Sequence, residues 1–221
     1  MPFDCRLKQP FNMLVSGPSK SGKTTFVSNL MKVSQDMFEK RPDYVILYYG
    51  NEQPLYQEMF RLNLIHEMIN FNELDPNYDD IYNKIQPFKE KNGSLIIFDD
   101  TLSDIKPGFE KIFQVLGHHN NCSLIYLTQN LFYNSKPFRN LSLQLDYIVL
   151  MRNLREGSQI RSLALQLCPG NFKFIINVYE AATELPYSYL FIDCGANSLK
   201  ELRLRSNIFP DEAPYTVYLE K

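Results

Sequence analysis

The 221-residue sequence lacks three features: an apolar run of transmembrane length, closely spaced cysteines and an excess of positive charge. Because the first ten residues are polar, it also lacks a signal peptide pattern, and we expect a soluble chain with no membrane span. The formal net charge of −2 excludes a generally basic nucleic-acid coat, although a local basic patch is still compatible with it.

The cysteines are too widely separated for a metal-ligand or redox motif, so we expect reduced thiols in an intracellular compartment. They are Cys5, Cys122, Cys168 and Cys194. We expect Cys122 and Cys194 to pack in or beside strands. No repeat or low-complexity segment divides the chain. We therefore predict a single domain over residues 1–221, with a lead-in at 1–10 and a C-terminal hairpin and tail at 186–221.

One stretch matches the P-loop pattern of glycine, four residues, glycine, lysine and then serine or threonine. It reads Gly17-Pro18-Ser19-Lys20-Ser21-Gly22-Lys23-Thr24 and is followed by Thr25. The glycines let backbone N–H groups approach phosphates, Lys23 supplies a charge for the β- and γ-phosphates, and Thr24 offers a hydroxyl to Mg²⁺. The apolar run 11–15 before it predicts a buried strand, and 25–38 after it predicts a helix, whose N-terminus favours anions. We therefore expect this stretch to bind ATP with Mg²⁺.

The rest of the chain alternates predicted strands and helices, which indicates an α/β fold. Strands are expected at 44–50, 94–100, 122–129, 145–151 and 187–193, and 202–205 is expected to be a late strand with one polar face. The lead-in is expected to add a strand at the sheet edge. Helices are expected at 57–61, 65–69, 79–85, 109–116 and 158–167. Residues 172–182 are compatible with a helix or a strand, and we expect a helix.

Three polar residues follow predicted buried strands. Asp99 and Asp100 end the strand that begins at Ser94, and Gln129 ends the one that begins at Cys122. The C-terminal ends of parallel strands face the nucleotide in such sheets. We expect Asp99 to hold Mg²⁺, Asp100 to orient or deprotonate the attacking water, and Gln129 to sense the γ-phosphate.

Beyond these residues, the chain resembles the FtsK/HerA superfamily of additional-strand P-loop ATPases. Within it, the resemblance is to the poxvirus-type genome-packaging ATPases of large DNA viruses and virus-like transposons. It rests on the P-loop, on Phe98-Asp99-Asp100, on the run 127–132 that contains Thr-Gln-Asn, on 147–150 and 158–160, and on the Leu-Arg-Leu-Arg run within 202–210. The predicted fold is thus a mostly parallel central sheet flanked by helices, with a late C-terminal β-hairpin.

The resemblance implies an ATPase that threads double-stranded DNA into a preformed viral capsid as a homo-oligomeric ring, usually of six subunits. It also implies capsid or portal-vertex partners, and a location inside the infected host cell or in the virion. In such a ring a neighbouring subunit supplies an arginine to each site, for which Arg155 and Arg152 are the first candidates and Arg139 is the third. We expect Lys136 and Arg139, beside Phe132 and Tyr133, to contact DNA phosphates.

Two other functions are compatible with a P-loop. One is a nucleoside or nucleotide kinase, in which 152–161 would form a lid. The other is a nucleotide-dependent assembly protein that does not hydrolyse ATP, because Asp100 stands where many superfamily members have glutamate. The shorter aspartate requires the water to lie closer or to be held through Gln129.

Overall fold

The computed structural model describes residues 4–71, 78–99, 120–131, 143–155, 157–212 and 214–220. The expected helix 109–116, Asp100, Lys136 and Arg139 lie outside these ranges. The strands are β1 (Asn12–Ser16), β2 (Tyr44–Tyr49), β3 (Glu67–Asn70), β4 (Ser94–Asp99), β5 (Cys122–Thr128), β6 (Tyr147–Met151), β7 (Tyr189–Asp193), β8 (Leu204–Ser206) and β9 (Thr216–Val217). The helices are α1 (Lys23–Lys32), α2 (Ser34–Met37), α3 (Pro54–Arg61), α4 (Tyr78–Ile85), α7 (Gly157–Leu167) and α8 (Phe172–Ala182), with short 3₁₀ turns at Gln86–Phe88, Pro169–Asn171 and Lys200–Leu202.

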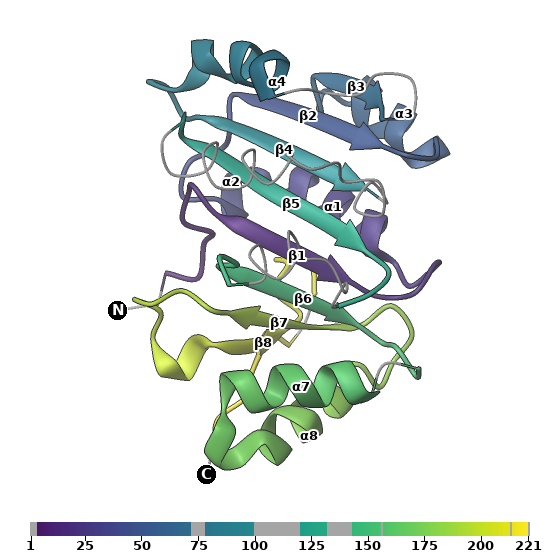
Figure 1. The fold of residues 1–221 in the computed structure, drawn as a ribbon, viewed down its shortest axis with the longest axis vertical. Coiled ribbons are helices and arrows are strands. Elements are labelled where there is room, and N and C mark those ends of the chain that lie inside the picture. The colour runs from purple at the N-terminus through teal and green to yellow at the C-terminus, as the bar shows by residue number, and fades with distance from the viewer. Residues whose placement is uncertain are drawn as a thin grey trace.

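Within the described residues, nine strands form one sheet in the order β3-β2-β4-β5-β1-β6-β7-β8-β9 (Figure 1). The first six strands in this order run parallel, and β7, β8 and β9 extend the sheet with antiparallel pairs. The predicted mostly parallel sheet with a late antiparallel extension is thus confirmed. In sequence, β2 lies between the P-loop strand β1 and the acidic strand β4, whereas in the sheet it is β5 that separates them.

Both faces of the sheet are covered. The strands β1, β4, β5 and β6 are buried along their whole length, as expected for parallel strands packed between two layers. Side chains alternate between the two sides: Leu14 of β1 belongs to one apolar cluster, and Met13 and Val15 belong to the other. α1 and α3 contribute to the cluster of Met13, and α1 and α2 are seen behind the sheet in Figure 1. Helices α4, α7 and α8 contribute to the cluster of Leu14.

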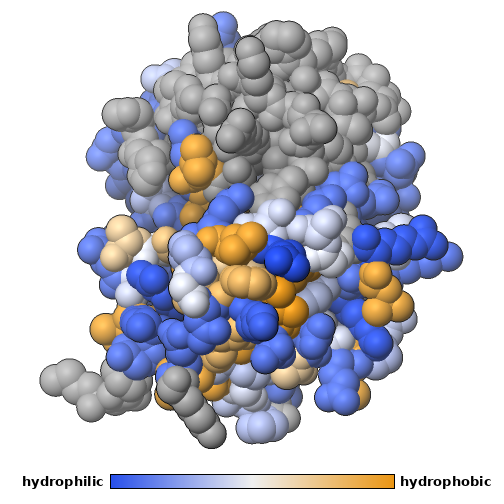
Figure 2. Space-filling view, turned by 60° about the horizontal axis from the view of Figure 1, so that its bottom comes forward, coloured by the Kyte–Doolittle hydropathy of each residue, from blue (hydrophilic) through white to orange (hydrophobic). Residues whose placement is uncertain are grey.

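The face formed by α7 and α8, turned forward in Figure 2, carries apolar side chains surrounded by polar ones. A groove of about 560 Å³ lies between these helices and the C-terminal strands. Its apolar lining includes Leu167, Phe174, Ile175, Tyr218 and Leu219. No helix among the described residues is long and apolar enough to cross a membrane.

Two expected helices differ from the structure. Residues 65–69 were expected to be helical, but Glu67–Asn70 forms the parallel edge strand β3, paired with Ile46–Tyr49 of β2. Four half-buried residues are too few for a period-2 pattern to emerge, and the partner strand determines their conformation. The helix expected over 25–38 is interrupted at Val33, which ends α1 with φ −105° and ψ 26° and precedes the single turn of α2.

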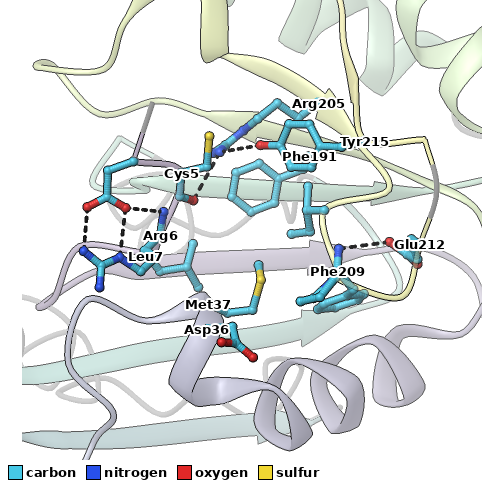
Figure 3. Close-up of a pocket in the computed structure, with 13 residues that line it drawn as sticks. Cys5, Arg6, Leu7, Asp36, Met37, Phe191, Arg205, Phe209, Glu212 and Tyr215 are labelled. Carbon is cyan, nitrogen blue, oxygen red and sulfur yellow. Dashed lines mark hydrogen bonds and ion pairs between the residues drawn. The ribbon is translucent and has the colours of Figure 1, made fainter. Parts of the chain in front are cut away.

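The expectation for 202–205 is wrong in detail. A 3₁₀ turn covers Lys200–Leu202, β8 begins at Leu204, and all three residues of β8 are buried, so the strand has no solvent-exposed polar face. Arg205 is only 3% exposed, and its guanidinium lies 4.5 Å from the ring centroid of Phe191 (Figure 3). Its Nη1 donates to Cys5 O at 3.3 Å and to Tyr215 Oη at 3.1 Å. This arginine therefore joins the N-terminal lead-in to the C-terminal strands.

The lead-in does not form the expected edge strand among its described residues. Leu7 makes a single parallel bridge to Phe38, with Leu7 N donating to Met37 O at 2.7 Å and Glu39 N donating to Leu7 O at 3.0 Å. The buried Leu7 side chain packs with Phe11 and Phe38 in one of the core clusters. The segment is therefore fixed against the end of α2 instead of the sheet edge.

Candidate functional site

The P-loop connects the C-terminal end of β1 to the first turn of α1. Its two glycines are required for different reasons. A Cβ on Gly17 would lie 2.5 Å from Met151 Cβ, so only glycine fits there, whereas Gly22 has φ +101°, which disfavours other residues. The loop is closed by Ser21 N donating to Pro18 O at 3.2 Å, and Gly17 N donates to Thr128 O at 3.1 Å. These constraints form a rigid cradle at a helix N-terminus.

Lys23 is buried in this cradle, with 7% of its surface exposed. Its Nζ donates to Gly17 O at 2.8 Å and to Pro18 O at 3.1 Å. An ammonium group is costly to bury without oxygen partners, and these carbonyls supply them. The charge is therefore held inside the loop, directly below the space where phosphates bind in a P-loop.

Asp99, at the last position of β4, lies across β5 from the P-loop and is 2% exposed. Its Oδ2 accepts hydrogen bonds from Thr24 Oγ1 at 3.0 Å and from Tyr56 Oη at 2.5 Å. The Thr24 hydroxyl and the Asp99 carboxylate thus converge. Hard oxygen donors are the ligands that Mg²⁺ prefers, so the residues present fit a magnesium ion.

The hollow above this cradle has a volume of about 310 Å³. It is lined by 19–25 of the P-loop, by Asp99, by Gln53 and Leu55 at the start of α3, and by Tyr187 from the loop between α8 and β7. Three larger hollows on the described surface, of about 560, 380 and 360 Å³, contain no comparable phosphate-binding loop; Figure 3 shows the second of them. The chemistry of the lining, and not its volume, identifies the candidate site.

Sequence reasoning missed Gln53, Leu55, Tyr56 and Tyr187. The first three lie in a segment whose composition suggests only a surface helix, and Tyr187 lies more than 160 residues beyond the P-loop. No spacing rule connects these residues to the P-loop. Pro54 at the first position of α3 is the one local signal, because it fixes where that helix begins.

Gln129 directly follows β5, the strand between β1 and β4. The sheet registers pair Thr128 with Ser16 and Leu127 with Asp99, so Gln129 emerges at the same end as the P-loop and Asp99. Its side chain is exposed. The strand before Gln129 therefore ends at the same edge of the sheet as the P-loop and Asp99, but Gln129 is not among the described residues that line the phosphate hollow. Asp100, with which it was expected to position the water, lies outside the described residues.

The arginines expected to act between subunits follow β6 and are exposed. Arg152 Nη1 donates to Glu184 O at 2.9 Å, and the backbone of Arg155 is anchored by its N–H donating to Asn153 Oδ1 at 3.0 Å. Tyr179 supports this segment by accepting from Asn153 N at 2.8 Å and donating to Met151 O at 3.1 Å. Neither arginine is among the described residues that line the phosphate hollow of its own chain.

Solved structures of similar fold include viral packaging proteins. The genome packaging NTPase B204 of Sulfolobus turreted icosahedral virus 2, in complex with sulfate, is 14% identical with a TM-score of 0.57, covering 88% of this chain and 96% of that one. The same protein in complex with AMPPCP gives 14% identity and a TM-score of 0.57, over 86% and 95% of the chains. The cytoplasmic domain of the type VII secretion ATPase EccC of Thermomonospora curvata gives 17% identity and a TM-score of 0.58, over 92% of this chain and 25% of that one.

These likenesses confirm the P-loop NTPase fold. No curated protein matches the sequence. Residues 3–141, more than half of the chain, match the family described as "Poxvirus A32 protein". The matched region contains the P-loop, Asp99 and Gln129, which are three of the elements on which the resemblance rests. The chain therefore belongs to the Poxvirus A32 protein family.

Proposed function

We propose that this protein is an ATP-hydrolysing motor that moves double-stranded DNA into a preformed viral capsid. Membership of the Poxvirus A32 family supports the packaging role, and so does the similarity in fold to a viral genome packaging NTPase. The observation that carries the ATPase assignment is the convergence of Thr24 Oγ1 and Asp99 Oδ2, 3.0 Å apart, beside the P-loop and the buried Lys23.

In this proposal the backbone N–H groups of 17–25 and the helix dipole of α1 bind the triphosphate. Lys23 holds the β- and γ-phosphates, exchanging its carbonyl partners for phosphate oxygens. Thr24 and Asp99 would hold Mg²⁺, which neutralises charge on the phosphates when bound. Asp100 orients or deprotonates the attacking water, and Gln129, at the end of β5, positions that water and senses the γ-phosphate.

Phosphoryl transfer also needs positive charge near the transferred group, and an arginine supplied by a neighbour meets this need. Arg155 is the first candidate because its backbone is fixed by Asn153 while its side chain is exposed. Arg152 ranks second because its guanidinium already donates to Glu184 O. The ring that this requires is proposed to contain six subunits.

DNA is proposed to pass through the ring in contact with Lys136 and Arg139. Such contacts go to phosphates, so they give no sequence preference and weaken with salt. Capsid or portal-vertex proteins would be the stationary partners of the motor. The kinase alternative receives less support, because β5 between β1 and β4 is the strand arrangement of additional-strand ATPases and not of simple nucleotide kinases.

The test is ATP hydrolysis by the full chain with and without double-stranded DNA, across a salt series, with Lys23→Ala as the inactive control. We expect DNA to stimulate hydrolysis, and the stimulation to fade as salt rises. Phosphate transfer to a nucleoside would instead indicate a kinase. Tight ATP binding without turnover under any condition would indicate an assembly protein.

A further inference from the structure

We propose that Tyr187 forms a nucleobase subsite at the mouth of the phosphate hollow, so that the base of the bound nucleotide stacks on its ring. This rests on the proposed nucleotide site and adds a residue far outside the P-loop. Tyr187 lies in the loop between α8 and β7, yet it is one of the residues that line the hollow with 19–25.

The ring lies directly against the P-loop. A Cβ built on Gly22 would be 3.3 Å from Tyr187 Cδ1 and 3.7 Å from Tyr187 Cβ. One edge of the tyrosine therefore contacts the glycine that precedes Lys23. The residue is nevertheless 72% exposed, so most of the ring surface is open at the mouth of the hollow.

The loop holds Tyr187 in an unusual conformation. Its φ is +65°, a left-handed value that residues other than glycine seldom adopt, and such values concentrate at ligand sites. The loop is fixed on both sides of the tyrosine. Arg152 Nη1 donates to Glu184 O at 2.9 Å, and Leu185 O accepts from Ser188 Oγ at 2.6 Å and from Ser188 N at 3.3 Å. The backbone that carries this exposed aromatic side chain is thus anchored on both sides.

The chemistry of the hollow fits this role. Most of its described lining is polar, which suits a triphosphate, and Tyr187 is the aromatic residue among the described lining residues. A nucleobase needs a flat apolar surface beyond the phosphates. Because every base has a π-face, stacking adds affinity without strong choice between bases. We therefore expect Tyr187 to strengthen binding of ATP and GTP alike.

The chain contains no tryptophan, so Tyr187→Trp introduces a single fluorescent indole at this position. The full-length variant is titrated, in the presence of Mg²⁺, with AMPPCP and separately with tripolyphosphate, which has no base. We expect AMPPCP to quench the indole emission and tripolyphosphate to leave it unchanged. Leu185→Trp is the matched control, since Leu185 lies in the same loop and is 68% exposed, and it should respond to neither ligand.

Affinities give the second measurement. Tyr187→Ala should weaken AMPPCP binding by about 5- to 150-fold, the range expected for loss of one stacked base, and leave tripolyphosphate binding unchanged. Tyr187→Phe should retain wild-type affinity. Equal weakening of AMPPCP and tripolyphosphate binding would overturn the proposal, because Tyr187 would then only shape the P-loop through Gly22. Unchanged AMPPCP affinity in Tyr187→Ala would also overturn it. A wild-type chain that binds AMPPCP but never hydrolyses ATP would contradict the motor and leave this subsite standing.

Discussion

Tyr56 Oη donates a hydrogen bond of 2.5 Å to Asp99 Oδ2, the oxygen that also accepts from Thr24 Oγ1. Tyr56 lies on α3 and is 1% exposed, and the centroid of its ring is 5.4 Å from the ring centroid of Tyr49 in β2. The tyrosine hydroxyl thus fixes the orientation of the carboxylate proposed to hold Mg²⁺. Loss of a partner that orients a metal ligand typically lowers metal affinity by about 10- to 100-fold.

Tyr56→Phe should therefore raise the Mg²⁺ concentration needed for half-maximal ATP hydrolysis by about 10- to 100-fold. Binding of Mn²⁺ in the presence of AMPPCP, followed by electron paramagnetic resonance, should weaken in parallel. Tyr48→Phe is the control, because Tyr48 is equally buried and stacks on Phe98, next to Asp99. Equal metal dependence of the two variants would show that the Tyr56 hydroxyl has only a packing role.

Gly22→Ala should disturb the phosphate cradle. Its φ of +101° is unfavourable for alanine, and the added methyl group would press on the Tyr187 ring at 3.3 Å. We expect a stability loss of about 1 to 3 kcal/mol and weaker AMPPCP binding. Thermal unfolding and calorimetric titration measure the two effects. Gly170→Ala is the control, because the new Cβ would meet nothing within 4 Å, and its stability and AMPPCP affinity should stay near wild type. If Gly170→Ala lost as much stability and affinity as Gly22→Ala, local strain at Gly22 would not explain the effect.

The sequence predicted the elements that obey strong local rules. The P-loop, the buried runs of β4, β5 and β6, and the helix α7 could all be recognised, because their patterns depend on neighbouring residues. β3 could not, because its four residues become a strand only by pairing with β2. Arg205 was expected on a polar face, since no local pattern reveals that Phe191, Cys5 and Tyr215 enclose it.

The same distinction applies to the site. Lys23, Thr24 and Asp99 are brought together as the motifs imply, because parallel strands place their C-terminal ends at one edge of the sheet. Tyr56 and Tyr187 reach the site from α3 and from the loop before β7. Their positions depend on tertiary packing, which a single sequence does not encode in a readable spacing.

Arg155→Ala should bind ATP almost normally and hydrolyse it about 10³- to 10⁵-fold more slowly, if Arg155 serves a neighbouring site. Mixing it with an excess of Lys23→Ala should restore part of the activity, because the second variant offers an intact arginine to the intact P-loop of the first. Activity of the mixture is compared with the sum of the two variants alone. A mixture that never exceeds the sum at any ratio would exclude Arg155 from action between subunits, and Arg152 and Arg139 would be tested in the same way.

Two of the four cysteines, Cys122 and Cys194, should be unreactive towards alkylating reagents in the native protein. Burial raises the pKa of the Cys194 thiol to about 12, and burial raises the pKa of Cys122 as well. In native protein at pH 8 we expect iodoacetamide to leave both thiols unmodified, as mass spectrometry of the peptides would show. Both pKa values are raised in the folded state, so these thiols contribute fully to the free energy of unfolding below the unfolded-state pKa near 9. This contribution falls as the pH rises towards 12. Rapid labelling of Cys122 in the native protein would contradict the buried position of β5.

The most direct test of the central claim is ATP-dependent displacement of a third strand from a triplex on double-stranded DNA. A motor that moves along the duplex strips the third strand, and the account predicts displacement with ATP and Mg²⁺, but none with AMPPCP or with Lys23→Ala. A wild-type chain that hydrolyses ATP at a rate independent of DNA, while the triplex stays intact, would contradict the account.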